Sequence, residues 1–332
     1  MEKMTIILNK KLKEVIMKKS TKRFLFLTSI TLAGIYAYNK FVASASTRKN
    51  LLSVNNGSFF EWKNGNVFYT KQGSGKPILL VHDVNPSSSS FEWTKLIKKL
   101  EKDHTVYTLD LLGCGRSDKP NFHYTNYMYV QLITAFVKQV IQEKSDVVAS
   151  NMSSSFILMA DHMDNQLFDK IIFINPVSMK NLQTVEDKKS KFKQTILNFP
   201  LIGTLIYNVL YNTIHIDRSF REIYFSKPQL ISSKIEDIYY ESSHLKDGNG
   251  RFLLSSIIGS YMNTNIVHAV KSLNHPIYLI GSNGRNNNIF IFDEYQKLNP
   301  NFESTMLSNG SLYPQLEIPD KVFAVLNNYL NK

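Results

Sequence analysis

The spacing of hydrophobic residues changes several times along the chain, and each change predicts a different element. Residues 59–71 alternate between apolar and polar on both sides of Asn64-Gly65, which is typical of a β-hairpin. Short continuous apolar runs follow it, and such runs indicate strands buried on both faces of a parallel sheet. These runs are residues 78–82, 105–109, 147–150, 171–174 and 277–280.

Segments with helical spacing separate these predicted strands. The helical segments are residues 91–100, 127–142, 154–163 and 320–330. Regular alternation of strand and helix predicts an α/β fold with a doubly wound, mostly parallel sheet. Residues 177–268 are mostly helical and rich in aromatic residues, and this stretch is long for one crossover between strands. We therefore expect a helical lid over the carboxyl ends of the strands.

A hydrophobic segment near the N-terminus precedes this domain. Residues 24–38 carry no charge, and residues 41–45 continue the apolar run after Asn39 and Lys40. About 20 helical residues cross a bilayer core, and a Lys near one end can extend its ammonium to the interface. Residues 24–45 are therefore a predicted transmembrane helix, preceded by a leader (1–23) and followed by a linker (46–58). A cleaved signal peptide and an amphipathic surface helix remain as alternatives.

The formal net charge of +12 is concentrated at one end of the chain. The first 50 residues hold eleven Lys or Arg against Glu2 and Glu14, so the basic groups flank the hydrophobic segment. A nucleic-acid partner is not expected, because such partners require basic groups gathered on the folded surface. Eight basic residues precede Phe24, which predicts a single-pass cell-membrane protein with a cytoplasmic N-terminus and an extracytoplasmic domain.

Cysteine and histidine usage limits the chemistry of the chain. Cys114 is the only cysteine, so no internal disulfide forms. No group of His, Asp and Glu has metal-ligand spacing, and we expect neither a metal nor another cofactor.

Three stretches resemble the α/β-hydrolase superfamily, especially its lidded branch with esterases, epoxide hydrolases and haloalkane dehalogenases. They are KPILLVHDVNPSSSSFEW (76–93), YTLDLLGCGRSDKP (107–120) and DVVASNMSSSFILMADHMDNQLFDKIIFINP (146–176). The resemblance covers residues 60–332. It implies a hydrolase core formed by residues 59–176 and 269–332, with the lid at 177–268 inserted between the two parts.

The first stretch is similar to the oxyanion loop of that family, in which backbone N–H groups stabilise developing negative charge. The loop implied here consists of His82, Asp83, Val84, Met152 and Ser154. The family has Gly where this chain has Asp83, and a carboxylate there opposes the oxyanion unless its side chain turns away. His82 is expected to organise the loop, and Asp110 and Arg116 are expected to pair beneath the site.

The third stretch has the layout of a nucleophile elbow, a tight turn that needs small neighbours. Two registers are open. Counting without gaps places Asn151 at the nucleophile position, and an amide cannot perform that attack. A shift of two residues places Ser153 there and puts Asn where Gly is usual, which left-handed geometry tolerates.

The other two triad positions lack the expected residues. The resemblance implies an acid near Gly284 and a histidine near Ser311, and no histidine follows His275. A Ser hydroxyl then has no evident general base. We therefore predict a weak or inactive pseudo-hydrolase that binds an apolar small molecule, a lipid-like group or a partner. The alternative is an active esterase-like hydrolase using Ser153 and an unusual base, for which His244 is the best candidate.

Overall fold

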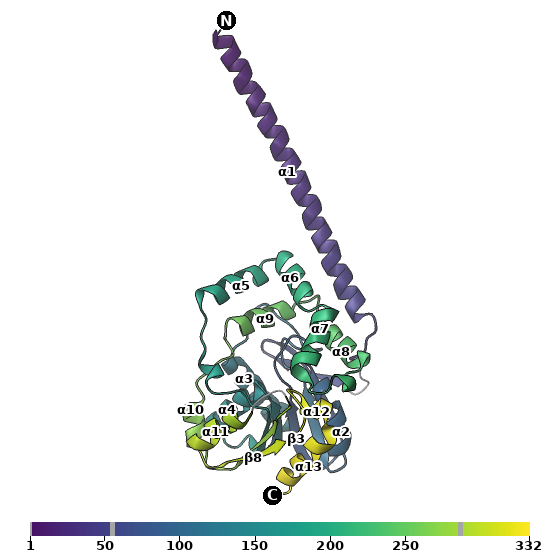
Figure 1. The fold of residues 1–332 in the computed structure, drawn as a ribbon, viewed down its shortest axis with the longest axis vertical. Helices are drawn as coiled ribbons and strands as arrows, with labels where there is room; N and C mark the ends of the chain where they lie inside the picture. Colours follow the sequence, from purple (N-terminus) through teal and green to yellow (C-terminus); the bar gives the residue numbers. More distant parts are fainter. Residues whose placement is uncertain (1, 54–56, 285–287) are drawn as a thin grey trace.

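Figure 1 shows the computed structural model, in which a long N-terminal helix projects from a central sheet and its surrounding helices. The structure describes the backbone of residues 2–53, 57–284 and 288–332, and the side chains of these residues from Thr21 onward. Residues 54–56 of the predicted linker and most side chains of the predicted leader lie outside the described residues.

Eight strands form the sheet in the order β1-β2-β4-β3-β5-β6-β7-β8. The pairs β1–β2 and β2–β4 are antiparallel and the other neighbours are parallel. The mostly parallel α/β sheet predicted from the sequence is thus confirmed. The strands are β1 (Gly57–Trp62), β2 (Gly65–Gln72), β3 (Lys76–Val81), β4 (His104–Leu109), β5 (Ser145–Ser150), β6 (Phe168–Ile174), β7 (Ile277–Ser282) and β8 (Phe302–Leu307).

Both faces of the sheet are covered by helices, which explains the continuous apolar runs. In β3, Ile78 and Leu80 pack in one core with α2 and α13, while Leu79 and Val81 pack in the opposite core with α3 and α4. The covering helices are α2 (Thr94–Leu100), α3 (Asn126–Phe136), α4 (Ser153–Met163), α10 (Val267–Ser272), α11 (Asn288–Leu298) and α13 (Pro319–Leu330), with the short α12 (Pro314–Glu317) before the last.

Residues 177–268, called the helical insert below, contain helices and no strand. The helices are α5 (Lys188–Asn198), α6 (Ile202–Leu210), α7 (Thr213–Ser219), α8 (Ser233–His244) and α9 (Gly250–Ile258). Figure 1 shows α5 and α6 at the end of the body from which the N-terminal helix projects. The predicted boundary at residue 268 falls inside α10, which contacts α4 and α11.

The N-terminal helix, α1 (Glu2–Thr47), is continuous over 46 residues. It contains the whole of the predicted transmembrane segment 24–45. Among the described residues, no helix is both long enough and apolar enough to cross a membrane. Large apolar side chains of α1 are nevertheless exposed, among them Phe24 (69%), Phe26 (66%) and Phe41 (70%).

The last turns of α1 are bonded to the helical insert. Asn39 donates its amide to the carbonyl of Leu201 and accepts a hydrogen bond from the Asn208 amide, both at 3.0 Å. Lys40 pairs with Asp247 at 2.8 Å. Because Asn39 is buried, this end of the predicted transmembrane segment is part of the folded body.

The chain just beyond α1 is held in the same way. The backbone N–H groups of Leu51 and Leu52 donate to the carboxylate of Glu241 at 2.8 and 3.0 Å. Glu241 lies on α8 and its side chain is buried. Its described hydrogen-bond donors are these two N–H groups, which tie the chain after α1 to α8.

We expect the substitution Asn39→Ala to loosen α1 from the insert. It removes the Asn39 partner of the buried Asn208 amide, which costs about 1–3 kcal/mol, while the Leu201 carbonyl keeps the N–H of Leu205. Limited proteolysis with trypsin should then cut after Lys40 about tenfold faster for each 1.4 kcal/mol lost. Tyr38→Ala, at a neighbouring exposed position, is the control and should leave the rate unchanged. Equal rates for both variants would contradict the assigned junction.

Candidate functional site

The turn between β5 and α4 places Asn151 at its tip. β5 ends at Ser150, Asn151 has a φ of 44°, and α4 begins at Ser153. Asn adopts this left-handed conformation more readily than most residues. The Asn151 N–H donates to the carbonyl of Ile174 at 3.0 Å, which fixes the turn against β6. An amide therefore stands at the tip of the turn, the position that the ungapped register gives to the nucleophile.

Ser153 has a different position and different partners. It is fully buried at the first turn of α4, and its hydroxyl donates to the backbone carbonyl of His82 at 2.5 Å. Ser154 donates its backbone N–H to Asn151 at 3.1 Å and its hydroxyl to the same carbonyl at 2.6 Å. Among the described residues, no imidazole is bonded to the Ser153 hydroxyl.

The Asp83 side chain accepts hydrogen bonds from backbone N–H groups that the resemblance implies as oxyanion donors. Its Oδ1 accepts the N–H groups of Val84 at 2.7 Å and Met152 at 3.2 Å. Its Oδ2 accepts the Asn151 amide and the Tyr313 hydroxyl, both at 3.0 Å. The side chain thus turns into the loop rather than away from it. A carboxylate oxygen of the chain itself lies where a substrate oxyanion would need these two N–H groups.

Tyr313 was not identified from the sequence. It lies just before α12, and its ring packs against Tyr224 with centroids 4.8 Å apart and against Tyr239 at 6.4 Å. Tyr224 and Tyr239 come from the helical insert and are buried with Phe220. Aromatic side chains of the insert therefore pack against Tyr313, whose hydroxyl is bonded to Asp83.

A second buried carboxyl group, Glu92, lies behind Asp83. Its Oε2 accepts the backbone N–H of Asp83 at 3.1 Å, and its Oε1 accepts the Gln315 amide at 2.6 Å and the Ser150 hydroxyl. Burial, and then the neighbouring Asp83 charge, raise the pKa of Glu92 to about 8. Glu92 is consequently neutral at pH 7. It was not singled out from the sequence, because a Glu between Phe91 and Trp93 resembles an ordinary helix start.

His82 shapes the loop through both ring nitrogens. Nε2 accepts the backbone N–H of Leu111 at 2.9 Å, so Nδ1 carries the proton and donates to the Asp83 carbonyl at 2.6 Å. Burial lowers the pKa of His82 from its ordinary value. The imidazole is therefore neutral, and its two nitrogens join the loop after β3 to the turn after β4.

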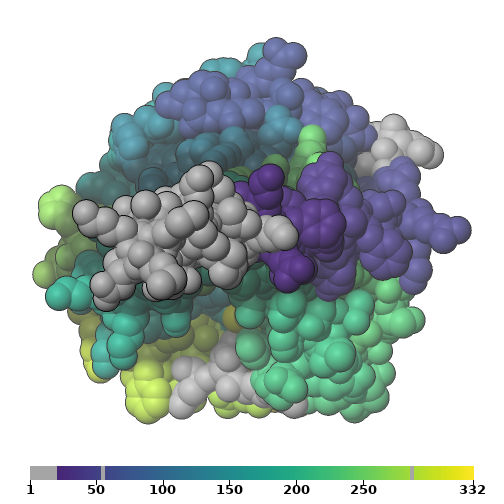
Figure 2. All heavy atoms as spheres, turned by 90° about the horizontal axis from the view of Figure 1, so that it is seen from above, coloured from purple at the N-terminus to yellow at the C-terminus, as the bar shows by residue number. Residues whose placement is uncertain are grey.

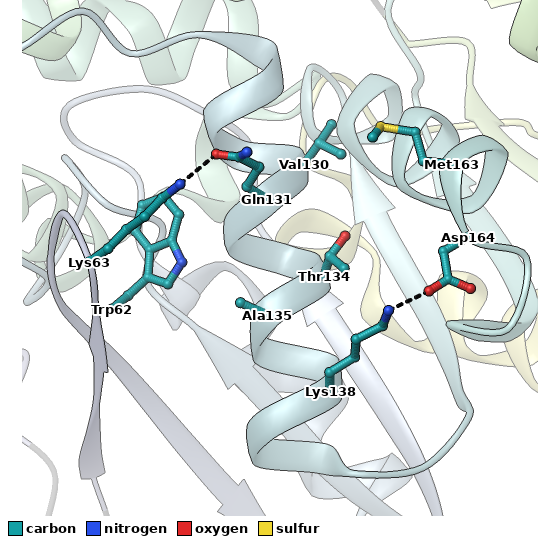
Figure 3. Close-up of a pocket in the computed structure, with 9 residues that line it drawn as sticks. All are labelled: Trp62, Lys63, Val130, Gln131, Thr134, Ala135, Lys138, Met163 and Asp164. Carbon is teal, nitrogen blue, oxygen red and sulfur yellow. Dashed lines mark hydrogen bonds and ion pairs between the residues drawn. The ribbon is translucent and has the colours of Figure 1, made fainter.

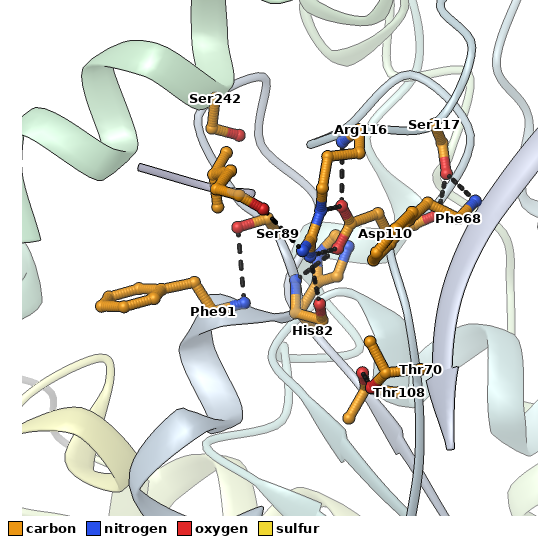
Figure 4. Close-up of polar contacts among 12 residues, drawn as sticks. Phe68, Thr70, His82, Ser89, Phe91, Thr108, Asp110, Arg116, Ser117 and Ser242 are labelled. Carbon is orange, nitrogen blue, oxygen red and sulfur yellow. Dashed lines mark hydrogen bonds and ion pairs between the residues drawn. The ribbon is translucent and has the colours of Figure 1, made fainter. Parts of the chain in front are cut away.

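Asp110 and Arg116 form a buried ion pair under this loop (Figure 4). The Arg116 Nε donates to Asp110 at 2.7 Å, and Nη2 donates to Asp110 and to the Ser90 hydroxyl. The guanidinium also stacks on Phe68, 3.8 Å from the ring centre. Burial acts to raise the pKa of Asp110, but Arg116 outweighs it and holds the pKa at about 2. This pair organises the turn that follows β4.

The implied acid and histidine positions, Gly284 and Ser311, lie in a network of amide, hydroxyl and carboxyl groups. A Cβ on Gly284 would lie 2.1 Å from the Gly310 carbonyl, so that position has no room for a side chain. Ser311 donates its hydroxyl to Ile223 at 2.7 Å. The Asn175 amide donates to the carbonyl of Ser311 at 2.8 Å, and Asn288 donates to Asn175 at 2.6 Å. A carboxyl group also reaches this corner: Glu317 accepts the backbone N–H of Ser311 at 2.9 Å and the Ser226 hydroxyl at 2.6 Å. No imidazole among the described residues is bonded there.

His244, the candidate alternative base, is buried on α8. Its Nδ1 bonds to the Tyr240 carbonyl at 2.9 Å, and burial lowers its pKa to about 4. No hydrogen bond among the described residues connects it with Ser153. The same residues contain no group of three or more His, Cys, Asp or Glu arranged to hold a metal ion.

A pocket of about 210 Å³ lies between the loop after β3 and the helical insert. Tyr211 donates its hydroxyl to Asn85 at 3.3 Å inside it. Its lining residues are Asn85, Ser87, Leu210, Tyr211, His215, Ile216, Ser219, Tyr224 and Leu254.

A second hollow, of about 450 Å³, lies on the side of the body and includes none of the residues discussed above. Figure 3 shows Trp62 and Lys63 on one side of it and α3 beside them. Two polar contacts, Lys63 with Gln131 and Lys138 with Asp164, border it. This hollow is separate from the carboxyl edge of the sheet.

Comparison with known proteins supports the fold. Residues 76–200 match the family model described as alpha/beta hydrolase fold. A haloalkane dehalogenase of Agrobacterium fabrum is 26% identical over 120 residues, which are 36% of this chain and 38% of that protein. The chain spans well under half the length of the curated relatives that it matches.

Two solved structures share the fold at low identity. The Cif epoxide hydrolase of Acinetobacter nosocomialis has a TM-score of 0.68 and 16% identity, covering 89% of this chain and 96% of that one. A structure described as a membrane phospholipase A has a TM-score of 0.66 and 16% identity, covering 93% of this chain and 98% of that one. These likenesses establish the fold.

The raised pKa of Glu92 gives a testable pH dependence. Between about pH 4.5 and 8 the unfolded chain releases a proton that folded Glu92 keeps, so stability falls as pH rises through this window. We expect the denaturation midpoint of the full chain to fall less between pH 5 and pH 9 in Glu92→Gln than in the natural protein. Glu61→Gln, an exposed control, should follow the natural protein. Parallel curves for all three would refute the assignment.

Proposed function

We propose that this chain is a member of the α/β-hydrolase superfamily and a membrane-tethered binding protein without significant hydrolase turnover. In this proposal α1 is the tether, and the pocket between the loop after β3 and the helical insert holds a neutral, partly apolar small molecule. The observation that carries the proposal is the Asp83 carboxylate on the N–H groups of Val84 and Met152.

The argument against turnover follows from charge. Oxyanion donors act by stabilising negative charge that develops on the substrate, and losing one costs about 10²–10³ in rate. Here Asp83 already supplies negative charge to both donors, so a substrate oxygen must displace it or meet repulsion. The amide of Asn151 cannot act as the nucleophile, and Ser311 cannot act as a general base. Each of these differences lowers catalysis separately.

The argument for binding rests on the lining of the 210 Å³ pocket. None of its nine lining residues is Asp, Glu, Lys or Arg. Leu210, Ile216 and Leu254 provide apolar surface, and Asn85 and Tyr211 provide hydrogen-bonding groups. Pockets of this kind bind ligands through apolar contact, with a few polar groups that orient them. A short neutral molecule with an apolar tail and a polar end matches this chemistry.

The argument for a tether rests on the apolar side chains that α1 exposes beyond the body. Phe24, Leu25, Phe26, Leu27 and Ile30 are each more than half exposed. Burying such side chains in lipid gains about 1.5–3 kcal/mol each. The fold shared with a protein described as a membrane phospholipase A supports the same environment. The basic leader favours a cytoplasmic N-terminus.

The alternative, an active esterase that uses Ser153, makes an opposite kinetic prediction. We expect the purified full chain to hydrolyse p-nitrophenyl acetate close to the uncatalysed rate. Ser153→Ala should change this rate little, because Ser153 is buried and bonded to a backbone carbonyl. Rapid turnover that is abolished by Ser153→Ala and lowered by His244→Ala would establish the esterase instead.

Ligand binding can be tested with monobutyrin, a short neutral glycerol ester. We expect titration calorimetry of the full chain in detergent to give a saturable heat. Leu254→Trp should remove it by filling the pocket, while Leu230→Trp, at an exposed position of the insert outside the pocket, should not. Equal heats for the two variants would place any binding elsewhere.

A further inference from the structure

We propose that the end of the helical insert formed by α5, α6 and their connection rests in the lipid surface beside α1, with Phe199 and Ile202 in the apolar region of the near leaflet. This inference rests on the proposed tether and adds a second membrane contact. It fixes which face of the body meets the lipid.

The first argument is length. The junction with the insert begins at Asn39, so residues 24–38 are the uncharged part of α1 that projects freely. Fifteen residues of helix span about 22 Å, whereas the hydrocarbon core of a bilayer is about 30 Å thick. If Phe24 lies at the far edge of that core, the near edge falls several residues beyond Asn39. The level of the junction is therefore within the near leaflet.

The second argument is the rigidity of the junction. Asn39 is bonded to Leu201 and to Asn208, which lie at the two ends of the segment that forms α6. Lys40 pairs with Asp247 beside them. The insert cannot move away from α1 without breaking these contacts. Whatever depth Asn39 has in the bilayer, the α5–α6 connection must have nearly the same depth.

The third argument is the chemistry of the exposed face. Apolar side chains gather around the junction, and hydrophobic groups in such number are unusual at a water-exposed surface. They are Phe192 (66%), Phe199 (57%), Ile202 (38%), Val209 (50%), Leu210 (45%) and Ile214 (67%). Figure 2, seen from the side on which α1 projects, shows the green part of the insert beside the purple base of α1.

Basic residues accompany these apolar side chains. The first two turns of α5 carry Lys188, Lys189, Lys191 and Lys193 around Phe192. Lys side chains on an interfacial helix can extend their ammonium groups to anionic headgroups while aromatic residues enter the apolar boundary. This combination fits a lipid surface better than an apolar protein partner.

One consequence concerns the pocket. Leu210 belongs both to this exposed face and to the lining of the 210 Å³ pocket. A ligand dissolved in the near leaflet would therefore reach the pocket without crossing water.

Depth measurements on the full chain test the proposal. Cys114 is buried and is replaced by Ala, and single cysteines are introduced at Ile30, Phe199, Ile202 and Asn331 for nitroxide labelling. The protein is reconstituted in vesicles of phosphatidylcholine and phosphatidylglycerol. Relaxation by oxygen, which concentrates in lipid, is compared with relaxation by a water-soluble nickel chelate. Asn331, exposed at the C-terminal end of the body, is the control in water (Figure 1).

The expected result is an oxygen-to-nickel accessibility ratio at 199 and 202 several-fold above that at 331 and approaching that at 30. If position 30 is in lipid while 199 and 202 behave like 331, the tether stands and this inference is overturned. If position 30 is also in water, the tether itself fails. Spin–spin broadening between labels at 202 on two copies, with low oxygen accessibility, would assign the face to a dimer and overturn the inference.

Discussion

The Asp83 carboxylate links three segments that are distant in the sequence: its own loop after β3, the elbow after β5 and the segment before α12. Four donors converge on it, and hydrogen bonds to charged groups contribute about 1.5–3 kcal/mol each. These bonds offset the cost of burying the charge, which is several kcal/mol. The N–H groups of Val84 and Met152, which the resemblance implies as oxyanion donors, are used here to hold the Asp83 carboxylate. Stability and oxyanion binding therefore compete for the same donors.

The ionisable groups around Asp83 are arranged so that they do not compete with its carboxylate for these donors. Burial, and then the Asp83 charge, raise the pKa of Glu92, and burial lowers the pKa of His82, whose two ring nitrogens bond to the backbone. Below the loop, Arg116 compensates the charge of Asp110. The Asp83 carboxylate is thus at the centre of the site. A catalytic site that stabilises negative charge on its substrate needs backbone N–H groups that are not already bonded to a side chain of the protein.

The sequence predicted most strands of the sheet but few of the contacts at the site. Apolar runs predicted the central strands because these strands are buried on both faces, whereas β8 was missed because its middle residues are polar and partly exposed. The sequence showed Gly284 and Ser311 where the resemblance implies an acid and a histidine. Tyr313 was not visible, since its role depends on Asp83, 230 residues earlier in the chain. Contacts between such distant residues follow from the fold and leave no local pattern.

Helix α6 connects the proposed membrane contact with the loop that Asp83 organises. Asn208 on α6 bonds to Asn39 of α1, and Tyr211, three residues later, bonds to Asn85 in the loop after β3. Asn208 lies in the last turn of α6 and Tyr211 is the residue directly after the helix, so both bonds act on the same end of α6. A displacement of α1 relative to the body must therefore strain the contact at Asn85. The position of α1 and the shape of the pocket are mechanically coupled through a single helix.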